Sequence, residues 1–176
     1  MFSRLLRAVL VLPGTVLVLV PAMLVWPFAG TALRASPADP DDPRAWLGLA
    51  LLGCGLGLAV WTGRLFVRVG KGTPAPWDPP ERLVIEGPYR YVRNPMISSV
   101  LMMLAAEALL LGSWPIAAWL LVFFLGNAIY FPMIEEKGLR QRFGAAYDRY
   151  AQNVPRWLPR LTPWRPPDER SQAQLD

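Results

Sequence analysis

The stretch that decides the fold is residues 96–134, MISSVLMMLAAEALLLGSWPIAAWLLVFFLGNAIYFPMI, a run of 39 residues in which Glu107 is the single charged side chain. The tetrapeptide Gly112-Ser113-Trp114-Pro115 interrupts this run, and a capping residue followed by a proline is typical of the start of a helix. We therefore predict a tight hairpin of two membrane-crossing helices. Residues 96–111 reach only about 24 Å at 1.5 Å per residue, so the first helix of the hairpin is short.

An apolar run also stands near the beginning of the chain. Residues 8–29 include no charged side chain, and these 22 residues are enough to cross a hydrocarbon core of about 30 Å. A cleaved signal peptide is the competing interpretation. Its apolar region is usually shorter and ends at a small-residue cleavage site, so the pattern favours a retained span, kinked at Pro13 and Pro21.

A further span is predicted over residues 46–63, where Gly53 and Gly57 have the spacing of a close helix contact. Residues 30–45 then form an external loop, and residues 64–95, with six basic side chains and six prolines, form the longest loop. The chain has two Lys or Arg residues before the first span, two in the loop 30–45 and six in the loop 64–95. The hairpin turn has none, and eight follow residue 134. The positive-inside rule then predicts four spans, with both termini and the long loop in the cytoplasm.

Composition supports a membrane protein. Of the 176 residues, 53% are hydrophobic and 18% are charged, with a mean hydropathy of +0.28, which is too apolar for an ordinary soluble domain. The net charge of +5 could suit a nucleic-acid-binding protein, but the basic residues lie between apolar blocks, so we expect no nucleic acid partner. Cys54 is the single cysteine and there is no histidine, which excludes an intramolecular disulfide, a thiolate metal cluster and every histidine-based catalytic site.

An amphipathic helix is predicted beyond the last span, lying against the membrane or the bundle. Its apolar side chains recur at helical spacing opposite a charged face, in the order Leu139, Phe143, Ala146, Tyr147 and Tyr150. The predicted protein is therefore an all-α, integral membrane helical bundle. It divides into the N-terminal membrane helices (1–63), a core of loop, hairpin and C-terminal helix (64–162) and a disordered polar tail (163–176).

The predicted hairpin brings two polar segments of the chain to the same end of its helix pair. Residues 87–95 precede its first helix and Glu135-Glu136 follows its second, so both segments must lie at the same end of the pair. The sequence therefore predicts that Arg93 and Asn94 lie close to the two glutamates. An arginine and carboxylates at a membrane surface, with tyrosines near them, can bind a zwitterionic ligand.

The same residues resemble a known family. Over residues 87–159, nearly half the chain, the order and spacing of motifs is similar to the C-terminal signature of the isoprenylcysteine carboxyl methyltransferase and phospholipid methyltransferase family. The matching motifs are Gly87-Pro88-Tyr89-Arg90-Tyr91-Val92-Arg93-Asn94-Pro95-Met96, Glu135-Glu136, Leu139, Phe143-Gly144, Tyr147, Tyr150, Val154-Pro155-Arg156 and Pro159.

The resemblance implies an integral membrane enzyme, in the inner or plasma membrane, that moves a methyl group from S-adenosylmethionine to a lipophilic or amphipathic acceptor. It implies catalytic roles for Arg93, Glu135 and Glu136. It further implies that the cofactor is bound by Pro88, Tyr89, Tyr91, Arg93, Asn94, Pro95, Glu135, Glu136 and Tyr147. Displacement at a sulfonium needs no metal, and either glutamate could take the proton of an amine acceptor, whereas a carboxylate acceptor needs no base.

This chain departs from the isoprenylcysteine pattern Arg-His-Pro-x-Tyr-x-Gly. It has Asn94 in place of the histidine, Ile97 in place of the tyrosine and Ser99 in place of the glycine, while Asn-Pro-Met is similar to the phospholipid branch. The family's Gly-x-Gly in the preceding span has candidates in Gly53, Gly55 and Gly57. The acceptor, an isoprenylcysteine-type carboxylate or a phospholipid amine, is left open.

Structural interpretations of the same residues also stay open. The paired glutamates could simply begin a helix, Arg90 and Arg93 could be positive-inside anchors, and the tyrosines could be interfacial. Glu107 is best explained by its closeness to the outer membrane surface. Two other classes of protein remain: a reductase related to membrane sterol reductases that uses NADPH, and a non-catalytic membrane protein that retains the fold.

Overall fold

The computed structural model describes residues 11, 13–28, 37–71 and 80–166, and the elements in these ranges are helices joined by turns, with no strand among them. The predicted all-α class is thereby confirmed for the described part of the chain. In chain order the elements are η1 (Thr15–Leu19), α2 (Val20–Val25), η2 (Trp26–Phe28), α3 (Pro43–Leu65), η3 (Phe66–Gly70), η4 (Gly87–Arg90), α4 (Pro95–Leu110), α5 (Trp114–Tyr130), η5 (Phe131–Glu135), α6 (Glu136–Phe143) and α7 (Ala145–Asn153).

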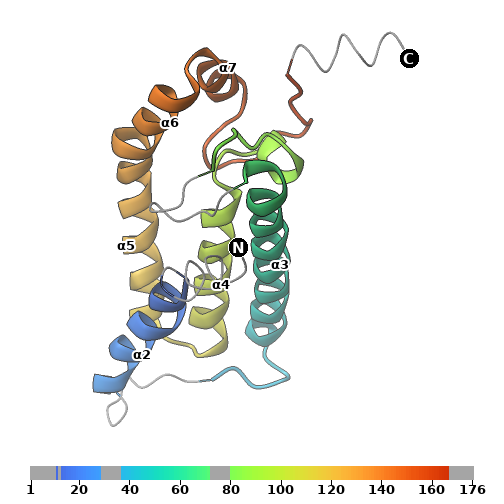
Figure 1. Ribbon diagram of the computed structural model, residues 1–176. Helices are drawn as coiled ribbons and strands as arrows, with labels where there is room; N and C mark the ends of the chain where they lie inside the picture. Colours follow the sequence, from blue (N-terminus) through green and yellow to red (C-terminus); the bar gives the residue numbers. More distant parts are fainter. Residues whose placement is uncertain (1–10, 12, 29–36, 72–79, 167–176) are drawn as a thin grey trace.

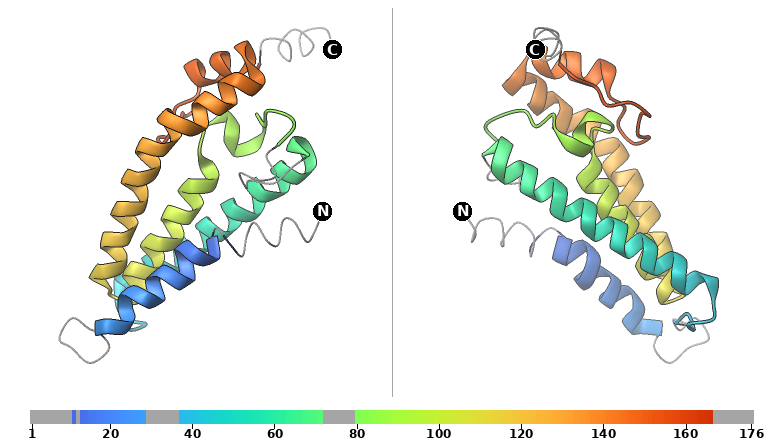
Figure 2. Two further views of the ribbon diagram at one scale, coloured as in Figure 1. Left: turned by 60° about the vertical axis from the view of Figure 1, so that its left-hand side comes forward. Right: turned by 90° about the vertical axis from the view of Figure 1, so that its right-hand side faces the viewer.

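Helix α4 is central in the bundle, between α3 and α5 (Figure 1). Leu104 and Ala106 on α4 and Ile116 on α5 have no exposed surface. Side chains of η1, α2 and α3 pack onto this core, and Figure 2 shows α2 crossing beside the α4 and α5 helices. Residues 8–10, 12 and 29 of the predicted first span lie outside the described residues.

Close contact between α3 and α4 depends on glycine, though not on the predicted pair. A Cβ at Gly55 would lie 3.0 Å from the carbonyl oxygen of Ser99, and a Cβ at Gly48 would lie 2.7 Å from Leu110. A Cβ at Gly53 or Gly57 would meet nothing within 4 Å among the described residues. The small-residue contact that lets these two helices approach is therefore Gly48 with Gly55, and the prediction of Gly53 with Gly57 was wrong.

Helix α3 runs further than the predicted span. The Asp42 carboxylate accepts a hydrogen bond from the Arg44 backbone N–H at 2.8 Å, which caps the helix start. At the other end the helical path continues through η3 to Gly70, and Lys71 ends it with a φ of 53°. The loop predicted from residue 64 therefore begins seven residues later, because charged side chains remove a helix from the bilayer without ending it.

The predicted hairpin is present, and its two helices diverge from their turn (Figures 1 and 2). The turn is made by Gly112, with a φ of 54°, and by the Ser113 backbone N–H, which donates to the Ala108 carbonyl at 3.0 Å. The Ser113 side chain makes no capping hydrogen bond, contrary to the capping role expected of it. Glycine conformation and Pro115 at the helix start therefore mark this turn.

Helix α5 continues through η5 and α6 as one apolar-to-charged helix, residues 114–143. Pro132 has no N–H to donate, and the helix widens into a π-helical turn around it. Gly144, with a φ of 51°, then separates α6 from α7. The single amphipathic helix predicted over residues 139–150 is therefore divided between the end of this long helix and α7, because Gly144 with its positive φ stands in the middle.

Two helical stretches are long and apolar enough to cross a membrane: Pro43–Gly70 and Trp114–Phe143. Thr15–Val25 and Pro95–Leu110 are apolar but shorter. Large apolar side chains on the outside of the bundle are exposed, among them Trp46, Leu121 and Ile129, as expected where lipid takes the place of water.

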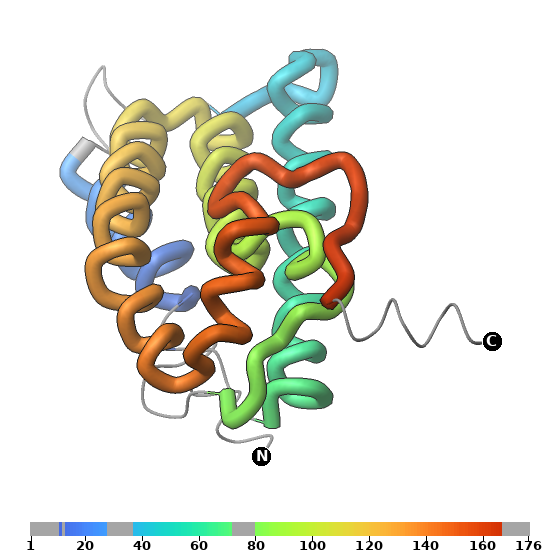
Figure 3. The backbone as a smooth tube through the Cα atoms, turned by 90° about the horizontal axis from the view of Figure 1, so that it is seen from above, coloured from blue at the N-terminus to red at the C-terminus, as the bar shows by residue number. Residues whose placement is uncertain are grey.

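Residues 154–166, which we call the C-terminal strap, follow α7 and cross over the ends of α4 and α3 (Figure 3). Backbone N–H groups of Arg160 and Trp164 donate to carbonyls of residues 91 and 90 at 3.0 and 2.9 Å. The Trp164 ring is buried against Tyr150, at 5.8 Å between ring centroids. The predicted disordered tail was placed from residue 163 onward, but residues 163–166 still belong to the strap. Residues 167–176 lie outside the described residues.

Candidate functional site

A cavity of about 370 Å³ lies at the end of the bundle that carries α6 and α7. This volume is within the range of small-molecule sites, roughly 300–1,000 Å³. The cavity lining combines apolar and polar side chains. The apolar ones include Phe66, Met96, Ile97, Phe131 and Ile134, and the polar ones include Arg93, Asn94, Glu135, Arg142 and Tyr147.

Two of the polar lining residues, Arg93 and Asn94, belong to the turn before α4. Asn94 is the N-cap residue of α4 and Pro95 occupies the first helical turn, so the Asn94 side chain is held at the entrance of that helix. The Arg93 backbone N–H donates to the Pro155 carbonyl of the strap at 2.8 Å. This contact fixes the backbone from which both polar side chains of the turn project.

Two donors at the cavity are buried and have no hydrogen-bond partner among the described residues: Arg93 Nε and Asn94 Nδ2. A buried donor without an acceptor costs roughly 1–3 kcal/mol, so native proteins seldom retain one unless a ligand or water supplies the acceptor. Both residues line the cavity. This arrangement fits a ligand with a carboxylate or another oxygen acceptor at this end of the cavity.

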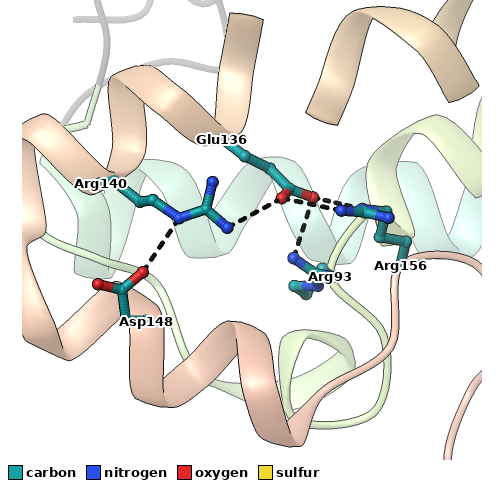
Figure 4. Close-up of polar contacts among 5 residues, drawn as sticks. All are labelled: Arg93, Glu136, Arg140, Asp148 and Arg156. Carbon is teal, nitrogen blue, oxygen red and sulfur yellow. Dashed lines mark hydrogen bonds and ion pairs between the residues drawn. The ribbon is translucent and has the colours of Figure 1, made fainter. Parts of the chain in front are cut away.

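Glu136 is enclosed by three arginines (Figure 4). Its Oε1 accepts from Arg93 Nη1 at 3.0 Å and from Arg156 Nε at 2.5 Å, and Arg140 Nη2 lies 3.6 Å from its Oε2. Arg140 Nε also donates to Asp148 at 3.0 Å. The Glu136 side chain is only 4% exposed, and the hydrogen bond it accepts raises the pKa of the Arg156 guanidinium.

The adjacent glutamates do not face the same space. Glu135 lines the cavity, whereas Glu136 is not among the lining residues and its carboxylate is satisfied by arginines. Consecutive residues of a helix are rotated by about 100°, so one helix cannot direct both carboxylates at one ligand. The structure brings Arg93 and Glu136 together, as the hairpin predicted, but it assigns the two glutamates different surroundings.

Three tyrosines are among the residues that line the cavity. Tyr89, Tyr147 and Tyr150 are buried, and the Tyr150 hydroxyl donates to the Tyr89 carbonyl at 2.8 Å. Burial raises the pKa of Tyr147, the negative charge of Glu136 adds to this, and Arg93 opposes it. Burial also raises the pKa of Tyr89 and of Tyr150, so all three phenols stay protonated at neutral pH.

Other residues predicted to bind a cofactor lie outside the cavity wall. Pro88 is buried in η4, Pro95 is buried at the start of α4, and the Tyr91 carbonyl accepts a hydrogen bond from the Arg160 N–H of the strap. Gly55 packs against α4. Within the described residues, no group of three Cys, Asp or Glu side chains could hold a metal ion.

Sequence reasoning gave no binding role to several cavity residues. These are Phe66 at the end of α3, Tyr150, Arg142 and the segment 80–84, which Arg142 holds by donating to the Pro80 carbonyl at 2.5 Å. The helical spacing that singled out Tyr147 also included Tyr150, so that signal was present. Phe66 and segment 80–84 gave no signal, because their part in the site depends on tertiary contact alone.

The described part of the chain is a helical bundle with two helices long and apolar enough to cross a membrane and with a cavity of small-molecule size at one end. Comparison with protein families assigns it further: the model of the phospholipid methyltransferase family matches residues 43–146, more than half of the chain. The chain belongs to the phospholipid methyltransferase family, and the protein is a membrane methyltransferase. No curated protein and no solved structure matched the chain.

Proposed function

We propose that the protein transfers a methyl group from S-adenosylmethionine to a lipophilic or amphipathic acceptor that reaches the cavity from the bilayer. The observation that carries this proposal is a pair of buried donors, Arg93 Nε and Asn94 Nδ2, that have no hydrogen-bond partner among the described residues and belong to two residues lining the cavity of a phospholipid methyltransferase family member. S-adenosylmethionine supplies an activated methyl group and also bears an amino-acid carboxylate, which these two donors fit.

The residues of the cavity suggest how the cofactor would be held. Asn94 and Arg93 would donate to its carboxylate, Glu135 would face its ammonium group, and the rings of Tyr147 and Phe66 would accommodate its apolar surface. Glu136 would act on the cofactor only through Arg93, as a positioning residue.

For a membrane arrangement, we propose four spans: residues 8–29 and the helices α3, α4 and α5. The cavity end carries most of the basic residues, including Arg82, Arg140 and Arg142, whereas the hairpin turn at the other end carries none. By the positive-inside rule the cavity and both termini would lie in the cytoplasm, at the inner or plasma membrane.

The acceptor is proposed to be an isoprenylcysteine-type carboxylate or a phospholipid amine. The apolar side chains of the lining, among them Met96, Ile97 and Ile134, suit the first atoms of a lipid chain. An amine acceptor must lose a proton, and Glu135 is the cavity carboxylate that could accept it.

Calorimetric titration of S-adenosylmethionine into the detergent-purified protein tests the proposal, with Asn94→Ala as the variant and Asn153→Ala as the control. Asn153 is exposed on α7 and its amide bonds only the Arg149 carbonyl within its own helix. Because a hydrogen bond to a charged group contributes about 1.5–3 kcal/mol, Asn94→Ala should weaken binding by roughly ten- to hundredfold. Asn153→Ala should bind like the wild type.

A second pair, Glu135→Gln with Glu81→Gln as the exposed control, tests the ammonium contact in the same way. Labelled methyl transfer into a lipid extract then identifies the acceptor. Binding of NADPH in place of S-adenosylmethionine would replace this proposal by a reductase. Binding of neither compound would indicate a family member that has kept the fold without its chemistry.

A further inference from the structure

The C-terminal strap exposes large apolar side chains where the rest of this end of the protein exposes polar ones. Leu158 is 81% exposed and Leu161 is 99% exposed. Beyond Ile134, these two are the large apolar side chains that the described chain leaves exposed, since α6 and α7 bury theirs against the cavity and the strap. Apolar side chains of this size are unfavourable in water, so their exposure on one short segment indicates a surface that contacts something apolar.

The contacts of Trp157 show how far along the apolar run of the long helix the strap reaches. Trp157 packs its ring against Phe131 and Phe124 of the long helix, at 6.0 and 5.4 Å between ring centroids. Phe131 and Phe124 precede Ile134, the last residue of the apolar run, so at 1.5 Å per residue they lie about 4 and 15 Å inside that run. The Trp157 ring is therefore level with the part of the helix that a bilayer surrounds.

The backbone of the strap is held from its other side. Three backbone hydrogen bonds of 2.8 to 3.0 Å join the strap to residues 90–93. The Arg93 N–H donates to the strap, and the N–H groups of Arg160 and Trp164 donate from it. In Figure 1 the strap descends from α7 to the upper end of α4 and rises again. These three hydrogen bonds hold the strap against the turn before α4 while Leu158 and Leu161 stay exposed.

We infer that the segment Trp157–Leu161 dips into the lipid bilayer as an interfacial anchor, with the acyl region of the membrane covering Leu158 and Leu161. The contacts of Trp157 with Phe124 and Phe131 place the segment beside the apolar part of the long helix, and tryptophan is a residue enriched at membrane interfaces. The inference rests on the proposed membrane arrangement, but not on methyl transfer.

The anchor would have a consequence for the site. Arg156, the residue before Trp157, holds Glu136 through both carboxylate oxygens, and Pro155 accepts the backbone N–H of Arg93. Lipid contact at Leu158 and Leu161 would therefore hold the strap against the turn that positions Arg93 and Asn94.

The test measures membrane depth at single labelled positions. Cys54→Ser removes the native thiol, and a nitroxide label is then attached to one new cysteine at a time in the full chain, reconstituted in vesicles of phosphatidylcholine and phosphatidylglycerol. The test positions are Leu158→Cys and Leu161→Cys, whose exposure makes the label tolerable to the fold. Gln152→Cys on α7 is the water control and Val122→Cys on α5 is the span control.

The readout is collision with oxygen, which concentrates in hydrocarbon, against collision with a water-soluble nickel chelate. We expect the oxygen-to-nickel ratio at positions 158 and 161 to exceed that at position 152 severalfold and to approach that at position 122. Equal ratios at 152, 158 and 161, with a high ratio at 122, would overturn the anchor and leave the proposed spans intact. A low ratio at 122 would overturn the proposed membrane arrangement and the anchor with it.

Discussion

Glu136 carries a structural prediction that can be worked from its exposures. Replacing Glu136 with glutamine keeps the size of the side chain and removes the charge that faces three arginines. Arg156 and Arg140 have side chains 40% and 45% exposed, so water continues to solvate them. Arg93 is only 10% exposed and would keep a buried charge without its counter-ion. Breaking a buried ion pair in this way costs about 3–5 kcal/mol, and because one arginine of the three is buried we expect about 3 kcal/mol.

Asp148→Asn is the matched control. It makes the same acid-to-amide change in an ion pair of the same length, 3.0 Å to Arg140, but with side chains 45% and 51% exposed. Exposed pairs contribute about 0–1 kcal/mol, so this variant should unfold almost like the wild type. The free energy of unfolding is measured by titrating sodium dodecyl sulfate into mixed micelles and following helix content by circular dichroism.

The reasoning is refuted if both amide variants lower the free energy of unfolding by the same amount, because the burial of Arg93 would then add nothing to the cost of removing its counter-ion. A double variant, Arg93→Met with Glu136→Met, provides an independent check. It removes both charges from the buried pair and should be more stable than either single variant. If it is less stable than both, the two side chains stabilise this end of the bundle through contacts other than their mutual ion pair.

Two other features lead to measurable outcomes. Gly55→Ala should lower the free energy of unfolding by about 1–3 kcal/mol, because the new methyl group meets the α4 backbone at 3.0 Å, whereas Gly57→Ala, which faces open space, should not lower it. Tyr150→Phe should cost about 1–3 kcal/mol by leaving the Tyr89 carbonyl without its donor, with the half-exposed Tyr130→Phe as control. Since burial raises the pKa of Tyr150, the unfolded chain releases this proton above pH of about 10 while the folded chain keeps it, so stability falls as the pH rises further. Tyr150→Phe should make that fall less steep, by up to about 1.4 kcal/mol per pH unit, in alkaline unfolding curves.

Local signals in the sequence were enough for the hairpin and for its main consequence. Gly112 and Pro115 mark a turn by backbone chemistry that no tertiary contact needs to supply, and a turn of this kind brings the ends of both helices together. The closeness of Arg93 to Glu136, 43 positions apart, follows from that geometry. The family resemblance rested on the same motifs, and the family model now matches residues 43–146.

The predictions failed where the end of a helix, or the face by which it packs, was inferred from hydropathy alone. Charge at Arg64 ends an apolar run, yet the helix continues to Gly70, since backbone hydrogen bonding does not depend on hydropathy. Several glycines of α3 have spacings that suit close packing, and only the observed contact with α4 selects Gly48 and Gly55. Which face of a uniformly apolar helix meets a neighbour is information that its composition does not contain.

The ion-pair cluster and the cavity can be explained by one property of the hairpin. Helices α4 and α5 separate as they leave their turn, so their far ends cannot be joined by direct apolar packing (Figure 2). The separation is bridged by Glu136 from one helix, Arg93 from the turn before the other, and Arg156 from the strap. A carboxylate held by guanidinium groups is a rigid, directional spacer, whereas apolar side chains would pull the two helices together. A cavity can therefore persist beside the cluster, and the Nε of Arg93, the arginine that closes the bridge, has no hydrogen-bond partner among the described residues.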